Sequence, residues 1–153
     1  MDLNTALRKA SALCSRQEYC CSDIRKKLGN WGVPLMAQQK IITTLIQEKF
    51  IDESRFADAF VRDKFRFNRW GRHKIKWQLK QKGIPEDIIN QAMAQIDEND
   101  YIQTLTTLLK TKQNQILDRE LQKQKAALIR NAVSKGFETD IIIPVVEQLL
   151  LKK

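Results

Sequence analysis

Hydrophobic residues recur along this chain at the spacing of an α-helix, and one helical phrase occurs three times. In the central copy, Ile75 and Leu79 lie four residues apart and are followed by Gly83. A glycine just after an apolar-periodic stretch is typical of a helix end, because glycine adopts the left-handed backbone conformation at no steric cost. The phrase also appears 51 residues earlier and, in weaker form, 53 residues later. Its copies are Ile24, Leu28, Gly32, Val33 and Pro34; Ile75, Leu79, Gly83, Ile84 and Pro85; and Leu128, Ala132, Gly136 and Phe137.

A helix with one apolar face precedes each copy, and another follows it. Before the central copy, residues 52–54 carry acidic and short polar side chains, which accept the free backbone N–H groups of a helix start. Phe56 and Phe60 follow at helical spacing, and then either the stem of Lys64 or Phe67. The pattern predicts an amphipathic helix that leads into the central copy.

The boundaries of the other helices follow from similar signals. The helix of the central copy is expected to begin at Arg72, after the break at residues 70–71, and to stop at Gly83. In the last helix, Pro144 is expected in the first turn, after a cap at Thr139 or Asp140. A proline is tolerated there because its missing N–H has no helical partner.

The repeats predict an all-α fold built from three tandem three-helix modules. We expect these at residues 1–51, 52–98 and 99–153, with short polar junctions between them. A module of about 50 residues buries little surface, so its neighbours or a partner should help to stabilise it. Modules joined in line also predict an elongated, curved array whose concave side can follow another polymer.

Composition adds a strong positive charge to this picture. The 153 residues carry a formal net charge of +9, which favours nucleic acid, an acidic protein or an anionic membrane surface as the partner. No stretch approaches the roughly 18–20 apolar residues of a membrane helix, and residues 1–10 lack the apolar core of a secretory signal. We therefore expect a cytoplasmic protein, and nothing in the sequence calls for more than a monomer.

The charge is concentrated in the central module. Between Arg62 and Lys82 there are nine lysines or arginines and one acid, Asp63. Two rows recur at helical spacing: Arg62, Arg66 and Arg69, and then Arg72, Lys76 and Lys80. The rows are either the solvated outer face of a basic protein or a stripe that binds a polyanion or an acidic protein. The stripe of the second interpretation consists of Arg62, Lys64, Arg66, Arg69, Arg72, Lys74, Lys76 and Lys80.

Residues for catalysis or metal binding are not grouped in this sequence. His73 is the only histidine, and no glycine-rich phosphate loop occurs. The three cysteines, at positions 14, 20 and 21, do not form a disulfide framework, and Cys14 fits the core face of a helix. We expect no enzyme activity, no metal and no cofactor. Trp31, Trp70 and Trp77 either pack at helix ends or, for the last two, stack on bases or in an apolar pocket of a partner.

Residues 51–62, IDESRFADAFVR, resemble the signature of the RecX family: an I-D-[DE] opening, then F-A, then an aromatic residue followed by V-R. The resemblance continues with a glycine, a basic residue and an I-x-x-x-L helix that ends in K-G-I, here residues 71–75, Leu79 and residues 82–84. The flanking copies resemble the family's outer repeats. Cys20 stands where the family often has a serine cap, and Trp77 stands where many members carry a small or polar residue.

The resemblance implies three tandem three-helix repeats and a non-enzymatic regulator of the RecA recombinase. Such a regulator binds in the groove of the RecA–DNA filament, suppresses ATPase, strand-exchange and coprotease activities, and binds single- or double-stranded DNA more weakly. The stripe is expected to contact the recombinase or DNA, and charge reversal at Arg66, Arg69 and Arg72 to abolish inhibition without disturbing the fold. The alternative is a basic helical module that binds nucleic acid without RecA.

Overall fold

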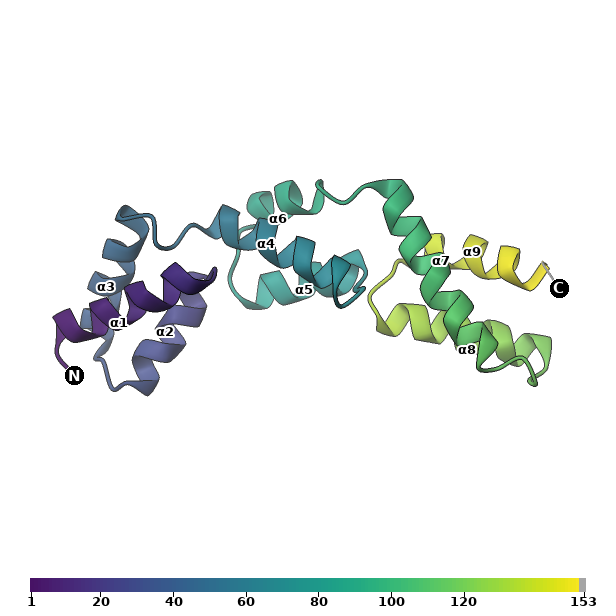
Figure 1. Cartoon of the computed structure of the whole chain (residues 1–153), viewed down its shortest axis with the longest axis horizontal. Helices are drawn as coiled ribbons and strands as arrows, with labels where there is room; N and C mark the ends of the chain where they lie inside the picture. The colour runs from purple at the N-terminus through teal and green to yellow at the C-terminus, as the bar shows by residue number, and fades with distance from the viewer. Residues whose placement is uncertain (152–153) are drawn as a thin grey trace. The chain divides into compact units, whose positions relative to one another are not determined.

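The structure is a computed structural model that describes residues 1–151, and these residues form nine α-helices and no strand (Figure 1). The predicted all-α class is confirmed. The helices are α1 (Leu3–Arg16), α2 (Cys21–Asn30), α3 (Leu35–Gln47), α4 (Glu53–Arg66), α5 (Arg72–Gln81), α6 (Glu86–Met93), α7 (Glu98–Asn114), α8 (Leu121–Ser134) and α9 (Thr139–Leu151).

The helices pack into two compact units. The first contains Met1–Phe60 and Leu79–Ala92, and the second contains Val61–Gln78 and the residues from Met93 onward. The division therefore falls within α4 and α5, the two helices that carry the basic stripe. The three repeat boundaries at residues 51–52 and 98–99 stay a prediction.

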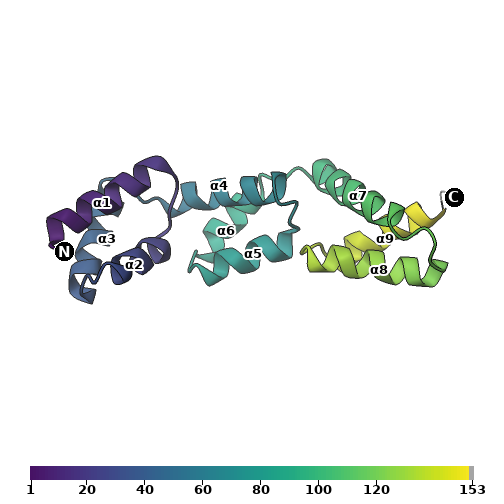
Figure 2. The ribbon, with the colours of Figure 1, turned by 60° about the horizontal axis from the view of Figure 1, so that its bottom comes forward.

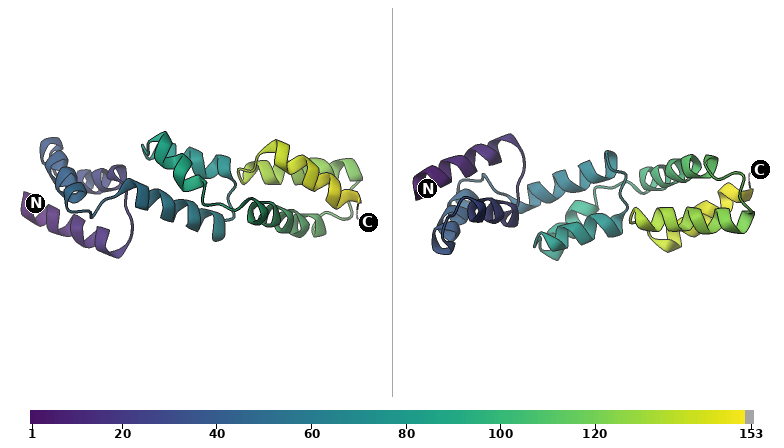
Figure 3. Two further views of the ribbon diagram at one scale, coloured as in Figure 1. Left: turned by 90° about the horizontal axis from the view of Figure 1, so that it is seen from above. Right: turned by 90° about the horizontal axis from the view of Figure 1, so that it is seen from below.

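The core of the first unit lies between α1, α2 and α3, which Figure 3 shows beside one another near the N-terminus. Ile24 and Leu28 of the repeated phrase are fully buried there. Asp2 caps α1 by accepting a hydrogen bond of 2.7 Å from the backbone N–H of Thr5. Cys14 packs partly buried against this core, as predicted, whereas Cys20 is fully buried.

The core of the second unit lies between α7, α8 and α9, which are labelled in Figure 2. Tyr101 and Phe137 are its largest buried side chains, and their ring centroids lie 5.0 Å apart. Aromatic rings at this separation stabilise a core beyond their buried area. Phe65, near the end of α4, packs against Tyr101 and so joins that helix end to the core.

A glycine ends the middle helix of each repeat with the same backbone geometry. Gly32, Gly83 and Gly136 have φ angles of 78°, 80° and 98°. In every copy, the N–H of the following residue donates to the carbonyl five residues earlier, at 3.0, 3.1 and 3.1 Å. This pattern satisfies helix carbonyls that would otherwise lack a donor. It confirms the helix ends that were predicted at these glycines.

The predicted place of Pro144 was wrong, and one of the two alternatives for the apolar face of α4 is excluded. α9 begins at Thr139, with Glu138 accepting the first helical hydrogen bonds, so Pro144 lies in the second turn. Its missing N–H leaves the carbonyl of Asp140 without the usual helical donor. Phe67 does not extend the apolar face of α4, since the helix ends at Arg66 and the Phe67 side chain is 80% exposed. The buried residues of α4 are Phe56, Ala57 and Val61.

Candidate partner-binding surface

The turn between α4 and α5 brings several of the predicted stripe residues around Trp70. The ammonium groups of Lys64 and Lys74 lie 4.9 Å and 4.6 Å from the centroid of the Trp70 ring. Cations over an indole ring are held by its π electrons. Trp70 is half-buried and its ring already contacts these two lysines, which favours the packing interpretation for this residue. Trp77, by contrast, is 58% exposed on α5.

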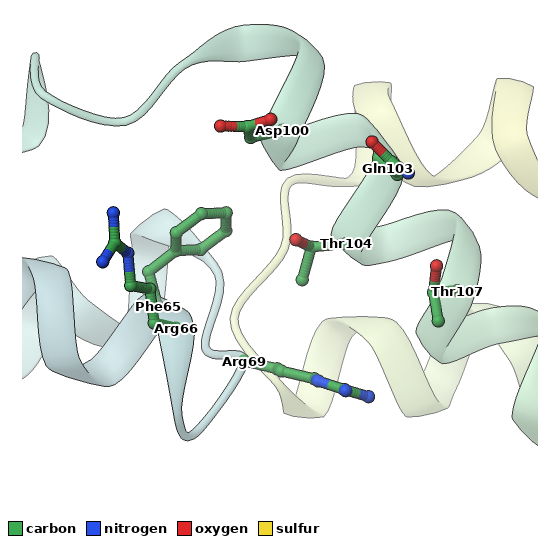
Figure 4. A pocket seen from close by; sticks show the side chains of 7 residues that line it. All are labelled: Phe65, Arg66, Arg69, Asp100, Gln103, Thr104 and Thr107. Atoms are coloured by element: carbon green, nitrogen blue, oxygen red, sulfur yellow. The ribbon is translucent and has the colours of Figure 1, made fainter.

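Arg66 and Arg69 line an open hollow on the second unit. The hollow has a volume of about 380 Å³, and Asp100, Gln103, Thr104 and Thr107 of α7 line it together with Phe65. In Figure 4, Arg69 extends beneath Thr104 and Thr107. Both arginines are exposed, and within residues 1–151 neither guanidinium forms an ion pair. Two cations are therefore presented beside hydroxyl and amide groups.

Arg72 is placed differently, because its side chain is used inside the protein. Its guanidinium donates to Glu138 at 2.9 Å and also to Glu98, and it lies 3.9 Å from the centroid of the Tyr101 ring. Its backbone N–H donates to the Tyr101 hydroxyl at 2.9 Å. The Arg72 side chain is 25% exposed. We therefore assign Arg72 to holding α5 against α7 and the start of α9, and not to the exposed surface.

Tyr101 completes this network. The ring is fully buried, and the hydroxyl donates to Glu138 while it accepts from Arg72. Burial and the hydrogen bond to Glu138 raise the pKa of Tyr101 far above its usual value. Burial alone would raise the pKa of Glu138, but the hydrogen bonds from Tyr101 and Arg72 outweigh it and hold that pKa below 4.5. The carboxylate is thus stabilised in its charged form.

The lowered pKa of Glu138 predicts an acid-sensitive second unit. Since the carboxyl binds protons more weakly in the folded state, its stabilising effect is complete above the unfolded pKa of about 4.5 and is lost as pH falls through the lower folded value. We expect the free energy of unfolding to fall over this window. The Glu138→Gln variant should lose part of this pH dependence, as measured by urea unfolding at a series of pH values. An unchanged pH profile would contradict this role for Glu138.

The backbone of α5 approaches the end of α8 closely beside the network. The N–H of Gly71 donates to the carbonyl of Lys135 at 2.7 Å, and the N–H of His73 donates to the carbonyl of Gly136 at 2.9 Å. A Cβ atom at Gly71 would lie 2.4 Å from the carbonyl carbon of Gly136. Glycine is needed here because two backbone segments occupy the space of a side chain.

A similar meeting of helix ends occurs in the first unit. Ser22, in the first turn of α2, donates its hydroxyl to the carbonyl of Lys82 at 2.9 Å, and the Lys82 ammonium pairs with Asp23 at 2.8 Å. Glu53, the first residue of α4, accepts from the N–H of Cys21 at 3.2 Å. The same kind of contact therefore occurs in both units. The start of α2 contacts the end of α5 in the first unit, and the start of α5 contacts the end of α8 in the second.

The remaining stripe residues lie near acids or are half-buried. Arg62 lies 3.4 Å from Asp63, with both side chains about half exposed. Lys80 belongs to the first unit, where its ammonium lies 3.7 Å from Glu86. Lys76 is half-buried on α5. Exposed ion pairs of this kind contribute little to the free energy of unfolding, and their groups can bind water or a partner instead.

Sequence reasoning missed that polar, uncharged side chains of α7 lie beside two arginines of the stripe. The signal was present, because Gln103, Thr104, Thr107 and Thr111 recur at three- and four-residue spacing on one helix face. In the structure, Gln103, Thr104 and Thr107 line the hollow together with Arg66 and Arg69, and Thr111 lines an adjoining hollow with Arg69. Within residues 1–151, no group of acidic, histidine or cysteine side chains has the arrangement of a metal site. No helix in that part of the chain is long and apolar enough to cross a membrane.

Comparison with known proteins identifies relatives over most of the chain. Residues 52–93 match the family model described as RecX, second three-helix domain. The chain is 29% identical to the regulatory protein RecX of Prosthecochloris aestuarii, with 97% of this chain and 96% of the relative aligned. It is 26% identical to that of Lactobacillus johnsonii, over 96% of this chain but 54% of the relative. The match to the Clostridium tetani protein is 34% identical, over 81% and 57% of the two chains.

The fold also matches that of a solved structure. The crystal structure of RecX from Lactobacillus salivarius superposes with a TM-score of 0.84 over 97% of both chains, at 22% sequence identity. The repeated glycine turn, the all-helical architecture and the alignments along nearly the whole sequence agree with one another. The chain belongs to the RecX family.

Proposed function

We propose that this protein is a non-enzymatic regulator that binds the RecA–DNA filament in its groove and inhibits RecA. The reactions inhibited are ATP hydrolysis, strand exchange and coprotease activity. Two features support the proposal: the curated relatives are regulatory proteins, and a cationic surface lies on the repeat that matches the family model. The acidic recombinase surface or DNA phosphate would be the counterpart of this surface.

The observation that carries the proposal is the state of Arg66 and Arg69. Both guanidinium groups are exposed and form no ion pair within residues 1–151, so binding an anionic partner breaks no ion pair there. Lys64 and Lys74 add charge nearby, around Trp70. A protein that bridges neighbouring recombinase protomers through this surface inhibits by binding one filament conformation in preference to the others.

The test is the ATPase activity of the cognate RecA that depends on single-stranded DNA, titrated with this protein at fixed, moderate salt. We expect suppression at less than one molecule per recombinase monomer with DNA in excess. The Arg66→Glu/Arg69→Glu variant should need a concentration higher by at least about tenfold for each reversed charge. Arg72 is left out of this variant because it supports the fold.

The matched control is Arg25→Glu/Lys26→Glu, which reverses two exposed charges on α2 in the first unit. It makes the same change in net charge and should inhibit like the unaltered protein. Full inhibition by the folded Arg66→Glu/Arg69→Glu variant would exclude this surface as the contact. Absence of inhibition by the unaltered protein would reject the proposed function.

A second candidate is a basic module that binds nucleic acid without RecA. It is favoured by the hydroxyl and amide side chains beside Arg66 and Arg69, since these groups donate to phosphate oxygens. Such a module would suppress the ATPase only by competing for DNA, so added DNA would relieve the suppression. A module that contacts about six phosphates should also lose affinity steeply with salt, with a log–log slope near about −5.

A further inference from the structure

An apolar groove lies between α7 and α9 in the second unit. It has a volume of about 580 Å³, which is larger than the hollow beside Arg66 and Arg69. Most of its lining is apolar and consists of Ile102 of α7 and Ile141, Pro144, Val145 and Leu149 of α9. No residue of the basic stripe is part of this lining. The groove therefore favours an apolar occupant and not a polyanion.

The two walls of the groove run in the same direction. Near their starts, the Tyr101 hydroxyl of α7 donates to Glu138, which directly precedes α9. Near their ends, the Gln113 amide of α7 donates to the carbonyl of Leu149 at 3.3 Å. The α9 wall runs over residues 140–149, about 14 Å at 1.5 Å per residue. Between two and three turns of another helix fit along this length.

The two ends of the groove carry opposite charges. Asp140 lines it near the start of α9, and Lys110 lines it toward the other end. Both side chains are exposed, and neither forms an ion pair within residues 1–151. Pro144 lines the groove as well, and the backbone carbonyl that it leaves without a helical donor belongs to Asp140. The acidic end therefore presents a carboxylate and a carbonyl, and the basic end presents a cation.

An exposed face of α3, in the first unit, matches the centre of this groove. Leu35 and Met36 are 79% and 80% exposed, and Ile46, near the other end of the helix, is 48% exposed. Gln39 and Thr43 lie between them on the same face, at three- and four-residue spacing. All five side chains are uncharged, and the face is about 17 Å long. Exposed apolar groups in one row are typical of an interaction surface.

The ends of α3 also complement those of the groove. Pro34 is the N-cap of α3 and has no side-chain acceptor for the first N–H groups of the helix, whereas Asp97 accepts such a bond at the start of α7. The uncapped start of α3 carries partial positive charge, which is complementary to the acceptors of Asp140. Glu48, directly after α3, is exposed and is complementary to Lys110.

We propose that α3 of one copy of this protein lies in the α7–α9 groove of a second copy, parallel to both helices. The exposed apolar side chains of α3 fill the centre, its start meets Asp140, and Glu48 meets Lys110. Because the two surfaces differ, the contact is heterologous and joins copies head to tail. One helix in a groove buries less area than a standard interface, so we expect a dissociation constant in the micromolar range. The association goes beyond the proposed function, since it needs neither recombinase nor DNA.

The test is sedimentation velocity of the full chain alone, from about 5 to about 500 µM at moderate salt. We expect the weight-average sedimentation coefficient to rise with concentration. The Leu35→Ser/Met36→Ser variant removes the α3 face and keeps the groove, and it should weaken association at least about tenfold. Its matched control, Leu117→Ser/Leu121→Ser, removes two leucines that are 59% and 50% exposed elsewhere, and it should associate like the unaltered protein.

The Pro144→Lys variant blocks the groove and keeps the α3 face. The new side chain places a cation among the apolar lining, and its N–H satisfies the carbonyl of Asp140, so α9 stays stable while association weakens at least about tenfold. The Gln122→Lys variant adds the same charge at an exposed position of α8 and should associate normally. Circular dichroism and thermal unfolding check that each variant folds. Gln148→Lys, at an exposed position in the groove, replaces Pro144→Lys if that variant does not fold.

A mixture of the two blocked variants identifies the contact. Neither should associate alone, but together they should form a complex with one molecule of each, because one supplies α3 and the other supplies the groove. Undiminished association of Pro144→Lys alone would mean that the α3 faces contact each other, which would reject the groove as the site. A monomer at every concentration of the unaltered protein would overturn the proposal and leave the groove to a helix of a different protein.

Discussion

The Gly136→Ala variant should lose about 3 kcal/mol of unfolding free energy, among the largest effects of any single methyl group in this chain. Two costs combine. The added Cβ would lie 2.4 Å from the Cβ of Lys74 and 2.7 Å from its backbone nitrogen, so α5 must move away from α8. Overpacking of this kind costs about 1–3 kcal/mol. The φ of 98° adds about 1–2 kcal/mol for a residue with a side chain.

The repeats supply matched controls for this prediction. Gly32 and Gly83 occupy the same place in their own repeats with φ of 78° and 80°, but a Cβ there would meet no atom within 4 Å. Alanine at either position should lower the unfolding free energy only by the cost of a left-handed backbone conformation, about 1–2 kcal/mol. Urea unfolding followed by circular dichroism measures all three variants. Equal losses at the three glycines would contradict the close approach of α5 and α8.

After Gly136→Ala, we expect the next largest effect on stability from Arg72→Ala, which should lose about 2–3 kcal/mol of unfolding free energy. It removes the guanidinium donors to Glu138 and Glu98, and among residues 1–151 it leaves the 18%-exposed Glu138 carboxylate with Tyr101 as its only side-chain donor. Removing one partner of a buried ion pair is costly because the other charge remains desolvated, and the partial exposure here reduces that cost. The cation over the Tyr101 ring is lost as well.

The Arg62→Ala variant is the natural comparison. Arg62 also lies near an acid, Asp63, but both side chains are about half exposed, so the change should stay within about 0.5 kcal/mol. Arg72→Lys should fall between the two, because an ammonium cannot present the two separated donors of a guanidinium. A double-mutant cycle of Arg72→Ala with Glu138→Gln should show coupling between them. Equal stability of Arg72→Ala and Arg62→Ala would refute the assigned role.

This role changes how a charge-reversal experiment should be read. Reversal of Arg72 together with Arg66 and Arg69 was expected to leave the fold intact, but Arg72→Glu would place a third carboxylate beside Glu98 and Glu138. Lost inhibition would then report a disrupted second unit as readily as a lost contact. Reversal of only Arg66 and Arg69 avoids this ambiguity, since both side chains are exposed.

Most of the helices could be predicted from local patterns. The starts at residues 52–54 and at Arg72 and the ends at the three glycines depend on caps and on backbone preferences of neighbouring residues. Pro144 was misplaced because the start of α9 depends on Glu138, which the network with Arg72 and Tyr101 holds in place. Phe67 stayed open as an alternative to the stem of Lys64, because hydrophobic periodicity does not show where a helix stops.

The amino-acid pattern determined the helical class, the repeat and the concentration of positive charge, because each depends on residues close together in the chain. Only the tertiary structure decided what each charge does. Arg69 and Arg72 are three residues apart and equally basic, yet one is exposed beside α7 and the other is tied to Glu98 and Glu138. The physical reason is that pairing and desolvation depend on acids 26 and 66 residues away from Arg72, which only folding brings within hydrogen-bonding distance.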